Sequence, residues 1–317
     1  MQILRWQVGD ALVFRIGELD ASAALDGLIR EFNLADIRRA AWLTPHFVDD
    51  TGGLKGMVQA FLIRSAGQTI LIDPGVGNGK HRTAVPEWNK LETDFLQRLR
   101  ASGVEPGEVD YVVNTHLHFD HVGWQTLLVD DAWRPTFPAA RHVMSGEEFR
   151  YWQSQPRNEI TDQHAGFADS VLPVYEAGLV DLVADDHVVT DGVKLVPSPG
   201  HTPHHVSVLL ESGGKSALIT GDVMHHRARS PIRHGGRRQT SIPVKPAKHG
   251  PSSSSGSSTP TRSSSARISQ TRSRALSGEM VRRFGYKPPA GSCPLTCLRR
   301  HDGSAGRRER TDRALTR

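Results

Sequence analysis

Short apolar runs, each bounded by turn residues, recur through residues 1–226. Runs of this length, flanked by Gly, Pro, Asn, Asp or Ser, are typical of buried strands. The pattern predicts a strand pair at Phe61–Arg64 and Thr69–Asp73, joined by the turn residues at 65–68. Further strands are predicted at Tyr111–Asn114, Arg141–Met144, Val193–Val196, His205–Leu210 and Ala217–Thr220.

Helical patterns lie between these strands. Within Lys90–Ser102, four apolar side chains fall at helical spacing, and Gly103 follows as a stop signal. Glu147–Gln155 is predicted to form a second helix. Strands interleaved with helices indicate an α/β domain in which helices cover the sheets.

The apolar pattern ends after His226. Residues 252–265 are mostly serine, and no periodic apolar pattern follows them. Such a segment cannot bury enough surface to offset the entropy lost on ordering. We therefore expect a folded domain at residues 1–226 and a largely disordered tail at residues 227–317.

Charge divides the chain at the same point. Residues 1–226 hold 18 basic and 30 acidic side chains, whereas residues 227–317 hold 21 basic and 4 acidic ones. A block of one sign is typical of a solvated tail, often one that meets nucleic acid.

Both cysteines, Cys293 and Cys297, lie in this tail. The domain thus has no disulfide framework, and the chain shows no signal-peptide run and no apolar stretch long enough to span a membrane, so a cytoplasmic protein without a membrane partner is expected.

The segment Thr-His-Leu-His-Phe-Asp-His at 115–121 directly follows a predicted buried strand. His116 and His118 are one residue apart and can share a metal ion, while Asp120 and His121 can reach a second ion nearby. Imidazole and carboxylate ligands suit Zn²⁺ and also Mn²⁺, Co²⁺ or Fe²⁺. A surface loop that holds three histidines by chance is the alternative, and the position of the motif directly after a predicted buried strand argues against it.

Two later segments also place metal-binding side chains at predicted strand ends. Pro199 and Gly200 form a turn that can present His201. Gly221 allows close backbone approach, and Asp222 follows it at a strand end, where a carboxylate can bridge two cations. Either segment alone is a weak signal, but the order of all three favours one dinuclear site.

These motifs resemble those of the metallo-β-lactamase superfamily, from about Val58 to His226. Thr115 to Trp124, with Trp-Arg-Pro-Thr-Phe-Pro at 133–138, resembles the branch of quorum-quenching lactonases and methyl parathion hydrolase-like enzymes. The resemblance implies an αββα sandwich with two divalent metal ions at one edge. In this sandwich His205 supports the site rather than ligating, and His204 replaces a glycine of the family pattern. The implied ligands are His116, His118 and His201 for the first metal, Asp120 and His121 for the second, and Asp222 as the bridge.

The chemistry implied by the resemblance is hydrolysis by a metal-bridged hydroxide, with Asp120 orienting it and passing a proton to the leaving group. A lactone or ester is the expected substrate, with an acyl-homoserine lactone as one example. The alternatives are a phosphotriester hydrolase on the same site, or an inactive truncated relative whose tail binds a polyanion. Zn²⁺ is the expected metal, and the resemblance leaves room for a homodimer.

Five aromatic or thioether side chains are candidates for a substrate cleft, although core packing is the commoner role for such residues: Phe47, Met57, Phe61, Trp88 and Trp124.

The family branch has one more histidine ligand after the bridging aspartate, and the tail offers none in a strand context. We hypothesise that the tail is read in a shifted frame from about His226. With permitted codons, the run from Ser252 to Gln270 can then encode an apolar strand followed by Thr-His-Phe. The sandwich as printed would be incomplete at its C-terminal end. A genuine Ser/Arg-rich tail that binds RNA is the rival interpretation, and an uninterrupted printed frame in resequenced DNA would support it over the shift.

Overall fold

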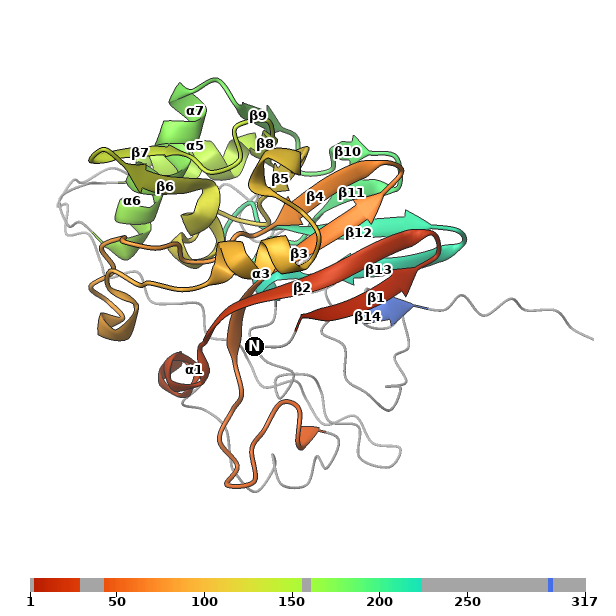
Figure 1. Ribbon diagram of the computed structural model, residues 1–317, viewed down its shortest axis with the longest axis horizontal. Helices are drawn as coiled ribbons and strands as arrows, with labels where there is room; N and C mark the ends of the chain where they lie inside the picture. The colour runs from red at the N-terminus through yellow and green to blue at the C-terminus, as the bar shows by residue number, and fades with distance from the viewer. Residues whose placement is uncertain (1–2, 29–42, 156–160, 224–295, 299–317) are drawn as a thin grey trace, which may run out of the picture.

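Two β-sheets form the centre of the computed structural model, which describes residues 3–28, 43–155, 161–223 and 296–298 (Figure 1). The larger sheet has the strand order β1-β2-β3-β4-β5-β8-β9 and the smaller one β10-β11-β12-β13-β14. Strands of the larger sheet are β1 (Leu4–Val8), β2 (Ala11–Asp20), β3 (Met57–Ser65), β4 (Gln68–Ile72), β5 (Tyr111–Val113), β8 (Arg141–Ser145) and β9 (Val180–Val183). Those of the smaller are β10 (Val188–Thr190), β11 (Val193–Pro197), β12 (Val206–Ser212), β13 (Lys215–Ile219) and β14 (Thr296–Leu298), and β6 (Thr126–Val129) pairs separately with β7 (Ala132–Pro135).

Helices connect and cover these strands. They are α1 (Ser22–Leu28), α3 (Phe95–Ala101), α4 (Phe119–Val122), α5 (Gly146–Ser154), α6 (Asp162–Gly166) and α7 (Leu172–Glu176), with a π-helical turn, η5, at Phe167–Val171. Short 3-10 turns are η2 (Pro86–Trp88), η3 (Pro106–Glu108), η4 (Gly123–Gln125) and η6 (Gly221–Val223). Among the helices of the described ranges, none is long and apolar enough to cross a membrane.

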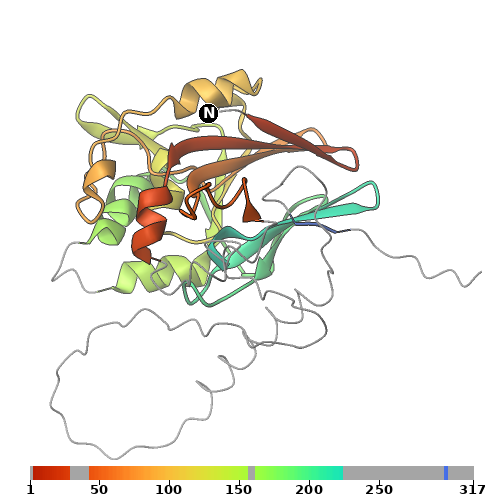
Figure 2. The ribbon, with the colours of Figure 1, turned by 90° about the horizontal axis from the view of Figure 1, so that it is seen from below.

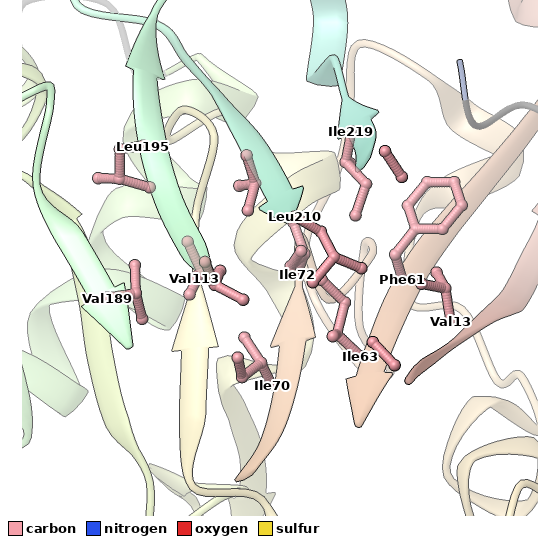
Figure 3. Close-up of a cluster of buried hydrophobic side chains, with 14 of the residues drawn as sticks. Val13, Phe61, Ile63, Ile70, Ile72, Val113, Val189, Leu195, Leu210 and Ile219 are labelled. Carbon is pink, nitrogen blue, oxygen red and sulfur yellow. The ribbon is translucent and has the colours of Figure 1, made fainter. Parts of the chain in front are cut away.

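The sheets stack face to face, as the view from below shows (Figure 2). Successive apolar side chains along the central strands of the larger sheet point to opposite faces, and both faces are buried. Ile63 and Ile70 point toward the smaller sheet, where they meet Leu210 and Ile219 (Figure 3). Their neighbour Leu62 points the other way and packs in a second cluster with Phe95 and Leu99 of α3. Strands buried on both faces have no polar side, and they therefore appear in the sequence as continuous apolar runs.

Most predicted strands are confirmed to within two residues at each end, but β3 begins at Met57, four residues before the predicted Phe61. The helix predicted at Lys90–Ser102 begins only at Phe95. Lys90 has a left-handed backbone, with φ of 54°. The segment up to Asp94 is bound to a neighbouring loop, since Thr93 N donates to Asn78 Oδ1 at 2.8 Å. Tertiary hydrogen bonds thus replace the first turn of the predicted helix.

The apolar pattern does not predict the other strands of the described residues, which are β1, β2, β6, β7, β9, β10 and β14. β1 and β2 form an antiparallel pair from Leu4↔Arg15 to Val8↔Ala11, and β2 joins this pair to the larger sheet through its pairing with β3. β14 pairs with β13 through Ala217↔Cys297, and three residues leave no periodic pattern in the sequence. The predicted disorder of residues 227–317 otherwise lies outside the described residues.

A buried histidine in β8 should make the folded protein sensitive to acid. His142 is fully buried, its Nδ1 lies 2.6 Å from Gln125 Oε1, and burial lowers its pKa from 6.5 to about 4. The unfolded chain therefore takes up this proton near pH 6.5 and the folded one only near pH 4, so stability is lost as pH falls through this window. We expect the chelator-treated wild type to lose about 2 kcal/mol more of its unfolding free energy than His142→Leu between about pH 7 and pH 4.5. Urea denaturation at both pH values measures this difference, and equal losses would show that His142 is not the sensitive group.

Candidate metal centre

The site lies where strands of both sheets end. β4, β5 and β8 are parallel neighbours, so the residues that follow them lie at one edge of the larger sheet. In the smaller sheet, the end of β11, the start of β12 and the end of β13 are paired at one edge. Val206 N donates to Thr115 O at 2.9 Å and joins the two edges. Side chains on short loops held by rigid strands can therefore converge there.

The first candidate ligand group contains the three histidines that the family resemblance implies for one metal ion. His116, His118 and His201 each place a ring nitrogen within 4.8 Å of the others. The Nε2 atom of His201 lies 2.8 Å from Nδ1 of His118. The His116 ring lies 4.6 Å from the His118 ring and 4.7 Å from the His201 ring, measured between centroids. Three imidazoles from two loops thus face one small volume.

A second group shares a member with the first. His116, His121 and Asp222 also place ligand atoms within 4.8 Å of one another. Asp222 Oδ1 lies 3.5 Å from His121 Nε2, and its Oδ2 lies 3.5 Å from His201 Nε2. One carboxylate therefore contacts a histidine of each group, which is the position that the resemblance implies for a bridging ligand.

Asp120 stands at the rim of this cluster. Its Oδ2 lies 3.7 Å from His121 Nε2, and its side chain is about one quarter exposed. Neither ligand group of the described residues includes it. The roles predicted for Asp120, as a ligand and as the group that moves a proton, therefore stay predictions.

Sequence reasoning did not single out Asp73, the residue after β4. Its Oδ1 accepts a hydrogen bond from Thr115 N at 2.8 Å, and its Oδ2 accepts one from Thr115 Oγ1 at 2.7 Å. The same Oδ2 lies 3.1 Å from His121 Nδ1. An aspartate at a strand end is common, and only the fold places this one under the histidine loop.

The hydrogen bonds around Thr115 determine which nitrogen of His116 is free to ligate. Because Thr115 Oγ1 donates to Asp73, it accepts from His116 Nδ1, which lies 3.0 Å away. The proton on Nδ1 leaves a lone pair on Nε2. That Nε2 atom is buried and has no hydrogen-bond partner among the described residues. A buried imidazole nitrogen of this kind, beside two further histidines and a carboxylate, fits a divalent cation such as Zn²⁺.

Electrostatics of the cluster also favour a cation. Burial lowers the pKa of His116 and of His118 well below the usual value, so both imidazoles are neutral, as metal ligands must be. At His121, burial opposes protonation, but Asp222, Asp120 and Asp73 outweigh it and raise the pKa well above the usual value. Three carboxylates around one imidazole create a negative site that a bound cation would neutralise.

His205 supports the site through both of its ring nitrogens. Its Nε2 accepts a hydrogen bond from Asp222 N at 3.1 Å, and its Nδ1 lies 2.9 Å from Ser198 Oγ. Gly221 has φ of 50°, and a Cβ there would lie 2.5 Å from Thr115 Oγ1. The close approach expected of this glycine is therefore confirmed, and it brings Asp222 against the histidine loop.

Candidate cleft residues are largely core. Phe61 and Trp88 are each 8% exposed and Trp124 is 4% exposed, and each belongs to a buried apolar cluster. Phe47 and Met57 are half-buried. The region from Ser252 to Gln270, where the shifted frame would encode one more histidine ligand, lies outside the described residues, so that hypothesis stays a prediction.

Comparison with solved structures supports the same fold. A probable metal-dependent hydrolase from Staphylococcus aureus aligns with a TM-score of 0.56 and 20% identity, over 71% of this chain and 78% of that one. AidC, a dizinc quorum-quenching lactonase solved with a product, aligns with a TM-score of 0.52 and 16% identity, over 68% of this chain and 72% of that one. At these identities the likeness concerns the fold alone.

Sequence comparison identifies the family. An N-acyl homoserine lactonase from a Bacillus species is 28% identical over 38% of this chain and 40% of its own length. A probable metallo-hydrolase of Mycobacterium tuberculosis is 30% identical over 49% of this chain and 50% of its own length. The chain thus spans about half the length of these curated relatives. The sequence profile of the metallo-beta-lactamase superfamily matches residues 53–261, more than half of the chain, and the protein therefore belongs to this superfamily of metal-dependent hydrolases.

Proposed function

We propose that the protein is a dinuclear metal hydrolase that opens lactones, with acyl-homoserine lactones as the first class to test. The observation that carries this proposal is the pair of ligand groups that share His116 and are linked by Asp222. Several relatives are named N-acyl homoserine lactonases, which supports the substrate class. Because four imidazoles supply most of the ligands, Zn²⁺ is the proposed metal, with Mn²⁺, Co²⁺ and Fe²⁺ as alternatives.

His116, His118 and His201 would hold one cation, and His121 and Asp222 would hold the other with the help of Asp120. Bound divalent cations supply a water molecule of near-neutral pKa and polarise a carbonyl oxygen. The chain itself contributes the orientation of the ligands. The hydrogen bond to Thr115 holds the proton of His116 on Nδ1, so the lone pair on Nε2 is available to the cluster.

Asp120 is the proposed proton carrier. Its carboxylate is partly exposed beside His121, so it can reach both the cluster and a substrate in solution. Ring opening of a lactone releases an alkoxide that needs a proton, and Asp120 would pass to it the proton that it takes from the attacking water. The cytoplasmic location and the homodimer stay predictions.

Metal analysis combined with a substrate panel tests the function. We expect about two equivalents of divalent metal per purified chain, the count that a two-metal site requires. Chelation should remove activity toward acyl-homoserine lactones, and Zn²⁺, Co²⁺ or Mn²⁺ should restore it, because His116 and His118 are neutral and the carboxylates around His121 attract a cation. Mass spectrometry of metals and kcat/KM for lactones, β-lactams and phosphotriesters are the measurements.

Each outcome of this panel discriminates between functions. A preference for phosphotriesters over lactones would move the protein to the alternative hydrolase class. Two bound metals without turnover of any substrate would favour the inactive relative. A folded chain without bound metal, even after incubation with Zn²⁺ or Co²⁺, would contradict the proposal altogether.

A further inference from the structure

Glu148 is a buried carboxylate that the metal site itself does not use. It lies in the first turn of α5, and only 1% of its surface is exposed. Ser145 caps this helix, since its Oγ accepts a hydrogen bond from Glu148 N at 3.1 Å. The carboxylate is therefore not needed to begin the helix, and it extends toward the two loops that carry the first ligand group.

The carboxylate accepts hydrogen bonds from both loops. Its Oε2 accepts from His204 N at 3.2 Å, and its Oε1 accepts from Leu117 N at 3.4 Å. Leu117 lies between His116 and His118, and His204 lies at the end of the turn that presents His201. One side chain thus links the histidine loop after β5 to the histidine loop after β11.

Two further contacts hold Glu148 in this place. Trp152, one turn along α5, donates its Nε1 proton to Glu148 Oε1 at 2.8 Å. The Trp152 ring also packs edge-on against the His118 ring, at 5.3 Å between centroids. Irregular loops hold few backbone partners, and a buried carboxylate with several donors is a strong and directional link between them.

His204 also connects the His201 turn to the start of α5, through Asp185. Its Nδ1 lies 3.3 Å from Asp185 Oδ2, and Asp185 Oδ1 accepts a hydrogen bond from Ser145 Oγ. His204 is the residue at which this chain departs from the glycine of the family pattern. The departure therefore places a side chain that ties the His201 turn to the start of α5.

We propose that Glu148 is a positioning residue that holds the His116–His118 loop and the His201 loop at the separation at which their imidazoles share one cation. The inference rests on the proposed metal site. It assigns Glu148 no contact with substrate or metal. Its prediction is that the spacing of the ligands, and hence metal affinity and ligand geometry, depends on this carboxylate.

The test compares Glu148→Gln with Glu147→Gln in the full-length chain. Gln at position 148 keeps the shape but directs an amide N–H₂ group at a backbone N–H, so one loop loses its link. Glu147 is the adjacent residue, is exposed, and pairs with Arg150 on the helix surface. We expect Glu148→Gln to bind Co²⁺ and Zn²⁺ about 10–100-fold more weakly in competition with a chromophoric chelator. The visible spectrum of its cobalt form should also change, while Glu147→Gln behaves as the wild type.

A merely structural role would give a different result. It would lower the melting temperature of the metal-free protein and leave the cobalt spectrum and affinity of the folded protein unchanged, which would overturn the inference. If Glu148→Gln does not fold, Trp152→Phe decides, because it removes one donor to Glu148 and keeps a ring beside His118. A several-fold weaker cobalt affinity supports the inference, and an unchanged affinity overturns it.

The two proposals fail in different ways. A wild-type chain that takes up neither Co²⁺ nor Zn²⁺ contradicts the proposed metal site. A wild type that binds metal, together with a Glu148→Gln variant that binds it equally well, contradicts the positioning role alone.

Discussion

His116→Ala is expected to lose the cation of the first ligand group and to reduce lactone hydrolysis by at least about a thousandfold. His116 is the member that the two groups of the described residues share. Its ring also packs against those of His121 and His205, at 4.2 and 5.0 Å between centroids. Its removal would therefore take a ligand from the first cation and would leave the imidazoles of the second group without the ring that they pack against.

Metal content and kcat/KM of purified His116→Ala are the measurements, with near-ultraviolet circular dichroism to verify folding. His187→Ala is the matched control, because His187 is exposed. A folded His116→Ala variant that keeps two metals and wild-type turnover would mean that the cluster is not the active site. Loss of metal in the His187→Ala control would point to a general defect instead.

Asp73→Asn is expected to weaken metal binding by about 10–100-fold, although Asp73 belongs to neither ligand group. Its carboxylate receives two hydrogen bonds from Thr115 and lies against His121 Nδ1. Asn keeps the size but replaces one oxygen by an N–H₂ donor, so one of these contacts becomes repulsive. Because breaking a buried pair leaves a polar group unpaired, we also expect about 1–3 kcal/mol of lost stability.

The control for Asp73→Asn should be an aspartate with the same backbone conformation as Asp73. Asp73 has φ of 50°, and Asn tolerates this left-handed region, so the substitution adds little backbone strain. Asp130 also has φ of 50° and is exposed between β6 and β7. Asp130→Asn should leave both metal affinity and the urea midpoint unchanged. A metal affinity of Asp73→Asn equal to that of this control would exclude a role for Asp73 in ordering the ligands.

The two predictions separate direct from indirect effects at one site. In the proposed site His116 would contact a cation directly, whereas Asp73 would act through Thr115 and His121. A direct ligand should change the number of metals bound, and an orienting carboxylate should change affinity at an unchanged number. Mass spectrometry of metals at saturating Zn²⁺ distinguishes the two, since mass action restores full occupancy only when the ligands are all present.

Local sequence determined the strands and the ligand-bearing loops. Tyr111–Val113 and residues 217–219 are apolar runs that a sheet buries, and the polar residues directly after them leave the sheet. His116, His118 and His121 follow the first, and Asp222 follows the second. The chemistry of these side chains and their place at strand ends can therefore be predicted without the fold, and the structure places them together.

Only the tertiary structure decided which other residues serve the site. Asp73 and Glu148 lie 75 residues apart in the printed sequence, and no local pattern connects either of them with the histidine loop. Their contacts arise because β4, β5 and β8 are parallel neighbours, which places the residues after each strand at the same edge. The start of α3 at Phe95 has the same kind of cause, since hydrogen bonds between Thr93 and Asn78 outweigh helix propensity. Propensity and periodicity act over a few residues, whereas the partners of a buried polar group are set by how strands pair and sheets stack.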